Sequence, residues 1–370
     1  MSDVEIGRSK RARAAYSFDD VSLVPSRRTR DDALVSLDWK IDAYSFNHPI
    51  IAAPMDSVVS PSSAKTFAAA GGLAILNLEG VWTRYEDPTG VLNDIAALDS
   101  KGATAKLQEI YAKPIKPELI AARIQEMRAS GITVAGALSP QRTAQFAKQV
   151  VDAGVDIFVI RGTTVSAEHV SNGGEALNLK EFIYQLDVPV IVGGCATYTA
   201  ALHLMRTGAA GVLVGFGGGA AHTTLDVLGV RVPMASAVAD VAAARRDYLD
   251  ESGGRYVSVI ADGSMGRSGD VSKAIALGAD AVVVGSTFAR ATDAPGRGKH
   301  WGIEATHLEL PRGELVDLGT TGTLSEIISG PSHTADGTMN MVGALRRAMA
   351  TCGYSDLKEF QRCEVVVTPN

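Results

Sequence analysis

Cysteine is scarce in this chain, with three residues among 370. Cys195, Cys352 and Cys363 lie far apart, and neither a CxxC pair nor a paired histidine motif accompanies them. The common sequence patterns of a zinc site are therefore missing. Unpaired, scattered cysteines are typical of a reducing compartment, so we expect a cytoplasmic protein.

Long apolar runs and an excess of positive charge are also missing. The N-terminal segment MSDVEIGRSKRARAAYSF has no apolar centre of the kind found in a signal peptide, and charges or glycines interrupt the apolar stretches elsewhere. We therefore expect neither secretion nor membrane insertion. The 35 basic and 41 acidic residues give a net charge of −6, which argues against a nucleic-acid partner.

What the sequence does contain is a repeated pattern of strand and helix. Hydrophobic residues make up 46% of the chain, enough for a sizeable core. Short apolar runs alternate with helical segments, which predicts parallel strands with crossover helices. The predicted strands are 50–53, 73–76, 133–138, 157–160, 188–192, 211–214, 257–261 and 281–284. The predicted helices are 62–70, 117–130, 141–153, 179–185, 198–207, 235–249, 271–277 and 287–291.

Eight such units predict a closed (β/α)8 barrel, the TIM barrel, in a single domain spanning 1–370. The phrases AGVDIFVI, TGAAGVLV and LGADAVVV repeat one helix-turn-strand unit, as barrel closure requires. The barrel core covers about 48–295, and a polar, helix-prone insertion at 81–117 interrupts it. We expect the remainder, 296–370, to form a flap and tail beside the barrel mouth, with a helix at 342–351 and a strand at 363–368.

The loops after the last two predicted strands have the features of a phosphate site. Gly263 and Ser264 follow one strand, and Gly285 and Ser286 follow the next. Backbone N–H groups at such turns bind phosphate oxygens, and these two loops commonly do so in this fold. The carboxylate of Asp262 offers two oxygens to the hydroxyls of a ribose. The alternative is that each glycine only ends a helix or opens a turn.

A loop with three consecutive glycines, at 217–219, follows the sixth predicted strand. Its backbone can approach a ligand closely, and its carbonyls could coordinate a monovalent cation. His222 and Thr224 lie at its tip, and a histidine facing a substrate exchanges a proton near neutral pH. The alternative is a mobile turn with both side chains in solvent.

Seven blocks of sequence resemble the IMP dehydrogenase and GMP reductase family, in the family's order, between Phe18 and Gln361. They are SFDDVSLVPSRRT, HPIIAAPMDSV, AGGLAIL, DVPVIVGGCAT, VGFGGGAAHTT, VIADGSMGRSGDVSKAIALGADAVVVGSTFA and GALRRAMATCGYSDLKEF. The resemblance implies a TIM barrel that assembles as a homotetramer and binds a purine nucleoside monophosphate (IMP, GMP or XMP) with NAD or NADP as cofactor. The chain resembles a third type of IMP dehydrogenase-related protein, found in actinobacteria, that is cysteine-less at the catalytic position.

Site residues follow from the resemblance position by position. It implies that Met55 packs under the purine, that His300 contacts the phosphate, and that the backbone of Gly302, Ile303 and Glu304 contacts the base. Arg161, Gly215 and Gly217 would face the cofactor. A potassium ion would lie on the loop backbone at Gly217, Gly219 and His222.

The departures from the family pattern concern the chemistry. The catalytic cysteine that attacks the purine C2 atom is replaced by His222, and an aspartate that holds the cofactor ribose is replaced by Arg161. Gly194, Ala220 and Leu213 stand where the family has asparagine, serine and arginine. An insertion of 81–117 takes the place of the regulatory domain. Imidazole is a poorer nucleophile here than a thiolate, so the usual covalent route is in doubt.

The sequence leaves three functions open. The first is oxidation of IMP to XMP with NAD, a step of GMP biosynthesis, with His222 and Thr224 as catalytic residues. The second is a purine-nucleotide-binding protein without redox turnover, regulating or co-assembling with a true dehydrogenase. The third is GMP reduction. Cys195 is either a relocated nucleophile or a small buried hydrophobic residue.

Overall fold

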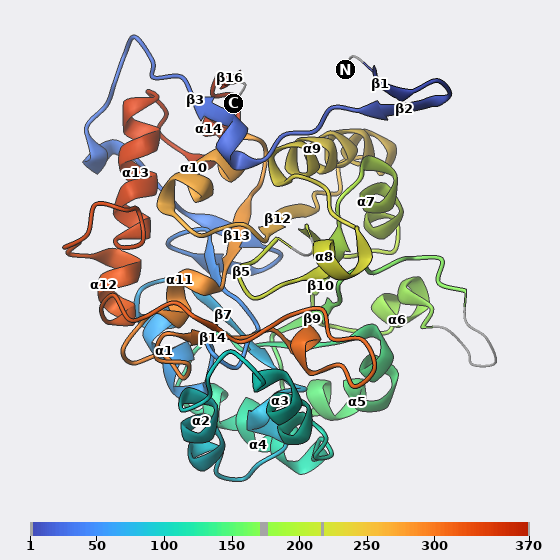
Figure 1. Cartoon of the computed structure of the whole chain (residues 1–370). Coiled ribbons are helices and arrows are strands. Elements are labelled where there is room, and N and C mark those ends of the chain that lie inside the picture. Colours follow the sequence, from blue (N-terminus) through green and yellow to red (C-terminus); the bar gives the residue numbers. More distant parts are fainter. Residues whose placement is uncertain (1–2, 171–176, 216–217, 369–370) are drawn as a thin grey trace.

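Eight parallel strands form a closed barrel in the computed structural model, which describes residues 3–170, 177–215 and 218–368 (Figure 1). Each strand pairs with its neighbours in chain order, and β13 closes the ring by pairing with β6, with Val283 opposite Ile51. The strands are β6 (Ile50–Ala52), β7 (Leu73–Asn77), β8 (Ala135–Leu138), β9 (Ile157–Arg161), β10 (Val190–Cys195), β11 (Gly211–Val214), β12 (Ser258–Asp262) and β13 (Ala281–Val284). This confirms the predicted TIM barrel.

The barrel helices also follow the prediction, with ends set by local capping. Proline occupies the first position of α1, α4 and α5, where its missing N–H is not needed. The helix predicted at 271–277 begins earlier, because the Asp270 carboxylate accepts a hydrogen bond from the Arg267 backbone N–H. The helices are α1 (Pro61–Ala69), α4 (Pro117–Arg128), α5 (Pro140–Asp152), α6 (Leu179–Tyr184), α7 (Tyr198–Met205), α9 (Met234–Glu251), α10 (Ser268–Ala276) and α11 (Ser286–Ala289).

The insertion at 81–117 folds into two short helices, α2 (Thr89–Ala96) and α3 (Ala103–Tyr111). They enclose a second, smaller apolar cluster that includes Leu107 and Ile95. Trp301 and Leu315 of the tail belong to the same cluster. The insertion is therefore packed against the tail segment at the barrel mouth, and a substitution in either part reaches the other.

The tail divides between two places. Its first part, with β14 (Lys299–His300), the 3-10 turn η4 (Ile303–Thr306) and β15 (Val316–Asp317), lies at the barrel mouth as expected. Its second part lies along the side of the barrel, where α13 (Met341–Thr351) packs against α10. The terminal strand β16 (Val365–Val367) pairs with β3 (Val21–Leu23), a pairing that the sequence did not predict.

The remaining elements lie outside the barrel. They are β1 (Asp3–Gly7), β2 (Lys10–Arg13), β4 (Trp39–Ile41), β5 (Tyr44–Phe46), α8 (Thr224–Leu228), α12 (Leu324–Ser329) and α14 (Leu357–Phe360). Across the described ranges, no helix has the length and apolar character needed to cross a bilayer.

A buried ion pair fastens the C-terminal segment to the barrel. Asp280, 3% exposed, accepts hydrogen bonds from Arg245 (2.6 Å), from the Val259 backbone N–H (2.8 Å) and from Tyr256 (2.6 Å). Gln361 donates to the same carboxylate from the C-terminal segment (3.1 Å). Removing such an acceptor leaves several buried donors without a hydrogen-bond partner.

We predict that Asp280→Ala lowers the free energy of unfolding by about 3–5 kcal/mol, because it leaves the buried Arg245 charge unpaired. The matched control is Glu251→Ala, which removes a half-exposed partner of Arg206 and costs about 0–1 kcal/mol. Urea denaturation of both variants measures the difference. Equal losses in the two variants would show that the Asp280 cluster does not hold the C-terminal segment.

Candidate functional site

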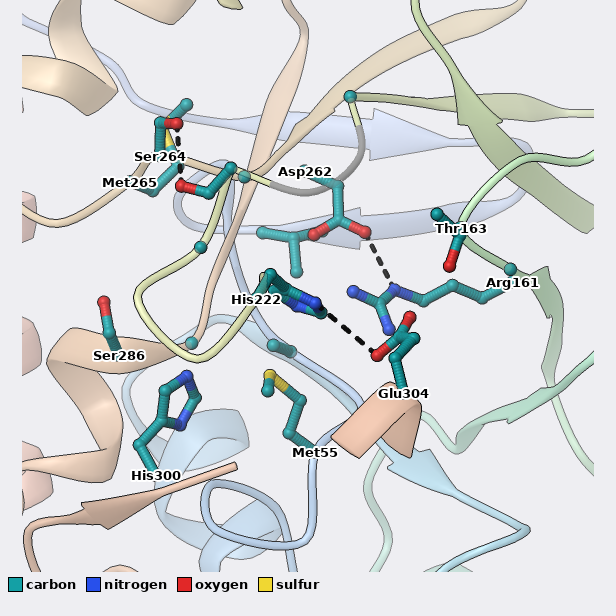
Figure 2. Close-up of a pocket in the computed structure, with 18 residues that line it drawn as sticks. Met55, Arg161, Thr163, His222, Asp262, Ser264, Met265, Ser286, His300 and Glu304 are labelled. Atoms are coloured by element: carbon teal, nitrogen blue, oxygen red, sulfur yellow. Dashed lines mark hydrogen bonds and ion pairs between the residues drawn. The ribbon is translucent and has the colours of Figure 1, made fainter. Parts of the chain in front are cut away.

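A cleft opens at the carboxyl ends of the barrel strands (Figure 2). The structure brings most of the residues singled out from the sequence to its walls. They are Met55, Arg161, Gly215, Gly219, His222, Asp262, Gly263, Ser264, Gly285, Ser286, His300 and Glu304. Gly217 lies outside the described residues.

One end of the cleft is built from turns with little side-chain bulk. Gly263 has φ +133° and Ser264 has φ +59°, so the chain after β12 turns through the left-handed region. Gly285 follows β13 directly, and a Cβ there would stand 3.2 Å from Met55 Sδ. Glycine keeps this space open between Met55 and the first turn of α11, which begins at Ser286, because a larger residue would require the Met55 side chain to shift by a few tenths of an ångström.

His300 lies at the same end and is neutral at physiological pH. Its Nδ1 lies 2.9 Å from Ser57 Oγ. Burial, with a smaller effect from the nearby His222, lowers the pKa of His300 to about 3. When the Ser57 hydroxyl donates to Nδ1, the ring carries its proton on Nε2 and can donate there. The residue therefore supplies a hydrogen-bond donor without a positive charge.

The opposite wall carries a row of four ionisable side chains, Asp262, Arg161, Glu304 and His222. Asp262, at the end of β12, accepts a 2.8 Å hydrogen bond from Arg161 Nε at the end of β9. The Arg161 guanidinium extends between the carboxylates of Asp262 and Glu304 (Figure 2). On its other side Glu304 Oε2 lies 3.6 Å from His222 Nδ1. All four side chains are at most 15% exposed.

These neighbours fix the charge of Glu304 and Arg161. Burial by itself would raise the pKa of Glu304, but the charges of His222 and Arg161 outweigh it and hold that pKa below its usual value. Burial would likewise lower the pKa of Arg161, and the Asp262 and Glu304 carboxylates outweigh it, so that this pKa is raised. Glu304 is thus a carboxylate at neutral pH, and its Oε2 is buried without a hydrogen bond from any described residue.

The tail holds the His222 loop in place. His222 forms an isolated antiparallel bridge with Gly313, and the Thr223 backbone N–H donates to the Arg312 carbonyl (3.2 Å). The imidazole ring is closely flanked by two glycines. A Cβ at Gly219 would stand 2.9 Å from His222 Cδ2, and one at Gly302 would stand 3.1 Å from Cε1. The loop is therefore held by the tail, which disfavours the alternative of a mobile turn with His222 in solvent.

Some expected residues occupy other places. Thr224 is the buried first residue of α8 and is not among the residues lining the cleft. Ile303 lines an adjoining recess, together with Asn77, Glu79 and Arg161. Arg161, expected to face the cofactor, instead points across the mouth to Asp262. One of the two Asp262 oxygens expected for the ribose is therefore already in use.

The cysteines are outside the cleft. Cys195 is 1% exposed, and its Sγ donates to the Leu213 carbonyl at 3.4 Å. Burial raises the pKa of Cys195 to about 12, so that the thiolate is absent near neutral pH. Cys195 is thus a small buried hydrophobic residue and the hypothesis of a relocated nucleophile is wrong. Cys352 and Cys363 are also buried and unpaired.

The described residues contain no group of three or more His, Cys, Asp or Glu that could hold a metal ion. The Gly219 carbonyl, one of the oxygens expected to coordinate potassium, already accepts a hydrogen bond from the His222 backbone N–H (3.0 Å).

Sequence reasoning missed Ser57, Thr163 and Arg312, although Thr163 lines the cleft and accepts a hydrogen bond from Arg312 (3.3 Å). The position of Thr163 just after a predicted strand was a signal that could have found it.

Comparisons with known proteins agree with this geometry. A family model described as the IMP dehydrogenase / GMP reductase domain matches residues 15–313. An uncharacterized oxidoreductase of Mycolicibacterium smegmatis is 49% identical, over 98% of this chain and 99% of the relative. An inosine-5'-monophosphate dehydrogenase of Methanocaldococcus jannaschii is 27% identical, over 97% of this chain and 94% of the relative. The crystal structure of an IMP dehydrogenase/GMP reductase-like protein from Corynebacterium glutamicum has a TM-score of 0.94 at 49% identity, covering 99% of this chain and 98% of that chain.

We predict that Cys195→Ala leaves the chemistry of the cleft unchanged, because the thiol faces the barrel wall and is protonated. The measurement is the rate of labelling of Cys195 by a thiol reagent in the native protein, compared with the rate in the unfolded protein. Native labelling as fast as in the unfolded protein would contradict this assignment.

Proposed function

Because the chain belongs to the IMP dehydrogenase / GMP reductase family of oxidoreductases, we propose that its cleft binds a purine nucleoside 5'-monophosphate and oxidises IMP to XMP. One observation carries the proposal. A cradle of turns (Gly263, Ser264, Gly285, Ser286) lies in the same cleft as a histidine paired with a buried carboxylate. The first can bind an anion and the second can move a proton.

The nucleotide would lie along the cleft from the cradle to His222. Backbone N–H groups of the cradle and the neutral His300 ring would bind the phosphate, and the free oxygen of Asp262 would accept from the ribose. Met55, 5% exposed, supplies an apolar surface for the purine. In this placement the purine C2 atom faces His222.

In the proposed reaction His222 is a base. Oxidation of IMP to XMP adds a water oxygen at C2, removes a hydride from C2 and releases one proton. Glu304 lies beside Nδ1 of His222 and orients the ring, so that Nε2 is left to accept the proton of the water. This role needs no thiol. It also supplies a water-activating group within the cleft.

We propose that residues beside the cleft hold a nicotinamide cofactor. The adjoining recess presents Asn77 and Glu79, both 8% exposed. Asn77 Oδ1 already accepts from the Glu79 backbone N–H (3.1 Å) and Glu79 Oε1 accepts from the Ser139 backbone N–H, so the second Glu79 oxygen is the acceptor left for an amide or hydroxyl donor. When bound, the cofactor accepts the hydride. Arg161 would attract the additional phosphate of NADP if its charge were free, but Asp262 already neutralises it. We therefore propose NAD.

Other parts of the proposal rest on family resemblance. We propose a cytoplasmic homotetramer and a potassium ion on the backbone of the His222 loop.

A second candidate is nucleotide binding without redox turnover. It is favoured by the position of the cysteines, which leaves no thiol in the described part of the cleft, and by the Arg161 hydrogen bond to Asp262. A protein of this kind would bind IMP, GMP or XMP and transfer no hydride. The third candidate, GMP reduction, uses the same cleft for a different reaction, in which a hydride is added at C2 of GMP and the 2-amino group leaves as ammonia to give IMP.

We predict that IMP stabilises the fold, by about 2.7 kcal/mol at a hundredfold excess over its dissociation constant. Asp262→Asn weakens this effect, because an amide oxygen is a poorer acceptor than a carboxylate oxygen. Asp226→Asn, on the exposed face of α8, is the matched control. Calorimetry and thermal melting test both variants. The absence of any heat or melting shift with IMP, GMP and XMP would rule out a nucleotide site.

We predict that IMP-dependent NADH formation falls about a hundredfold or more in His222→Ala, while the IMP dissociation constant changes little. Glu304→Gln lowers turnover in the same direction, because a neutral amide stabilises a protonated imidazole less than a carboxylate does. His203→Ala, a histidine on α7 far along the barrel wall, is the control.

Absorbance at the NADH band follows the reaction, and GMP with NADPH is assayed beside it. Turnover that survives His222→Ala would contradict the base role. Wild-type protein that binds IMP and shows no turnover, either with IMP and NAD or with GMP and NADPH, would establish the second candidate instead.

A further inference from the structure

A buried cluster of three side chains lies directly behind the cleft. Tyr111, the last residue of α3 in the insertion, donates a hydrogen bond to Asp56 Oδ2. Its oxygen also accepts a hydrogen bond from Trp301 Nε1 at 2.8 Å. Asp56 is 1% exposed, Trp301 is 2% exposed and Tyr111 is 8% exposed. The tyrosine hydroxyl therefore connects the segment around Asp56 with the segment around Trp301, which lie far apart in the sequence.

Each of the two segments also carries residues that line the cleft, close in sequence to its buried residue: Met55 beside Asp56, and His300 beside Trp301. Asp56 lies between Met55, which lines the cleft, and Ser57, whose hydroxyl contacts His300 Nδ1. Trp301 directly follows His300 and precedes the Gly302–Glu304 stretch. The cleft faces one side of these segments, and Tyr111 holds their other side. A shift of the tyrosine would move the phosphate contact and the purine surface together.

The hydrogen bonds around Asp56 make this arrangement specific. The carboxylate also accepts from the Val81 backbone N–H (2.8 Å) and from Asn77 Nδ2 (3.3 Å). A Cβ at Gly80 would stand 1.9 Å from Asp56 Oδ1, so only glycine lets the insertion start so close to the carboxylate. The apolar cluster around α3 and Trp301 excludes water that could replace a lost partner.

We propose that Tyr111 is a positioning residue for the nucleotide site, through which the insertion sets the relative position of the two cleft walls. Tyr111 does not line the cleft and is not a catalytic residue. The proposal rests on the proposed function for its ligand, IMP. It also has a consequence in the ligand-free protein, since the two walls are held together before any nucleotide binds.

The test removes one hydroxyl in each of two tyrosines of the insertion. Tyr111→Phe removes the link between Asp56 and Trp301. Tyr85→Phe is the matched control, because Tyr85 Oη donates to the Ile110 carbonyl (2.8 Å), beside Tyr111 on α3, and not to Asp56 or Trp301. We expect IMP affinity to fall about tenfold in Tyr111→Phe and to stay within about twofold of wild type in Tyr85→Phe.

Hydrogen exchange of the ligand-free protein gives a readout that needs no nucleotide. In Tyr111→Phe we expect faster exchange in peptides covering both 53–58 and 299–305. In Tyr85→Phe we expect faster exchange only within 81–117. Trp301→Phe removes the hydrogen bond between Trp301 and Tyr111 and keeps the one between Tyr111 and Asp56. It breaks the same link between the two walls, so we expect faster exchange in both peptides here too, even if Tyr111→Phe itself folds poorly.

The pH profile of IMP affinity separates positioning from general destabilisation. Burial raises the pKa of Asp56 to about 6, and the bonds from Tyr111, Val81 and Asn77, with the charge of Arg84, hold it from rising further. Arg84 and the charged residues near it, Glu79 and Arg142, are retained in both variants, so the effect of the Arg84 charge on Asp56 is expected to stay the same. Loss of the Tyr111 hydroxyl therefore raises the pKa of Asp56. Affinity that falls with acidification should fall at a higher pH in Tyr111→Phe, and at the wild-type pH in Tyr85→Phe.

Three results would overturn the proposal: unchanged IMP affinity in Tyr111→Phe, equal losses in Tyr85→Phe, or faster exchange confined to 81–117. If wild-type protein binds no nucleotide, the proposed function fails, and the exchange pattern still decides whether Tyr111 holds the two walls.

Discussion

The row of ionisable side chains from Asp262 through Arg161 and Glu304 to His222 is the interaction on which the site depends. A single buried charge at a barrel mouth is unfavourable, and here the Arg161 guanidinium lies between the carboxylates of Asp262 and Glu304. The four residues come from β12, β9, the tail and the loop after β11. The row therefore exists only when the barrel has closed and the tail has docked, which couples the chemistry of the site to the whole fold.

Under the proposed function, the same row would let a cleft whose described residues include no thiol oxidise a purine. A covalent route requires a strong nucleophile, whereas addition of water requires a base with a fixed orientation. His222 is held between Gly219 and Gly302 and lies beside the Glu304 carboxylate, which is an arrangement for proton transfer. On the other side of the cleft, Tyr111 joins Met55 and His300 through their chain neighbours. The insertion thus supports the purine and phosphate end while the tail supports the histidine.

The sequence predicts the barrel well because its strands are buried on both faces. The strands at 211–214 and 281–284 have the predicted ends, since each is a purely apolar run between a turn and a glycine. The glycine cradle was predictable because it lies at strand ends. The Arg161 to Asp262 bond was not, because it joins positions 101 residues apart and depends on how two side chains cross the barrel mouth. Thr224 failed as a cleft residue for a similar reason: the start of α8 turns its side chain into the protein.

The most direct test of this account is a crystal structure of the protein with IMP bound. The account predicts the phosphate at the Gly263–Ser264 and Gly285–Ser286 turns, one ribose hydroxyl on Asp262, the purine over Met55, and C2 facing His222 Nε2 with Glu304 still beside Nδ1. IMP bound elsewhere, or bound in the cleft with C2 turned away from His222, would contradict it.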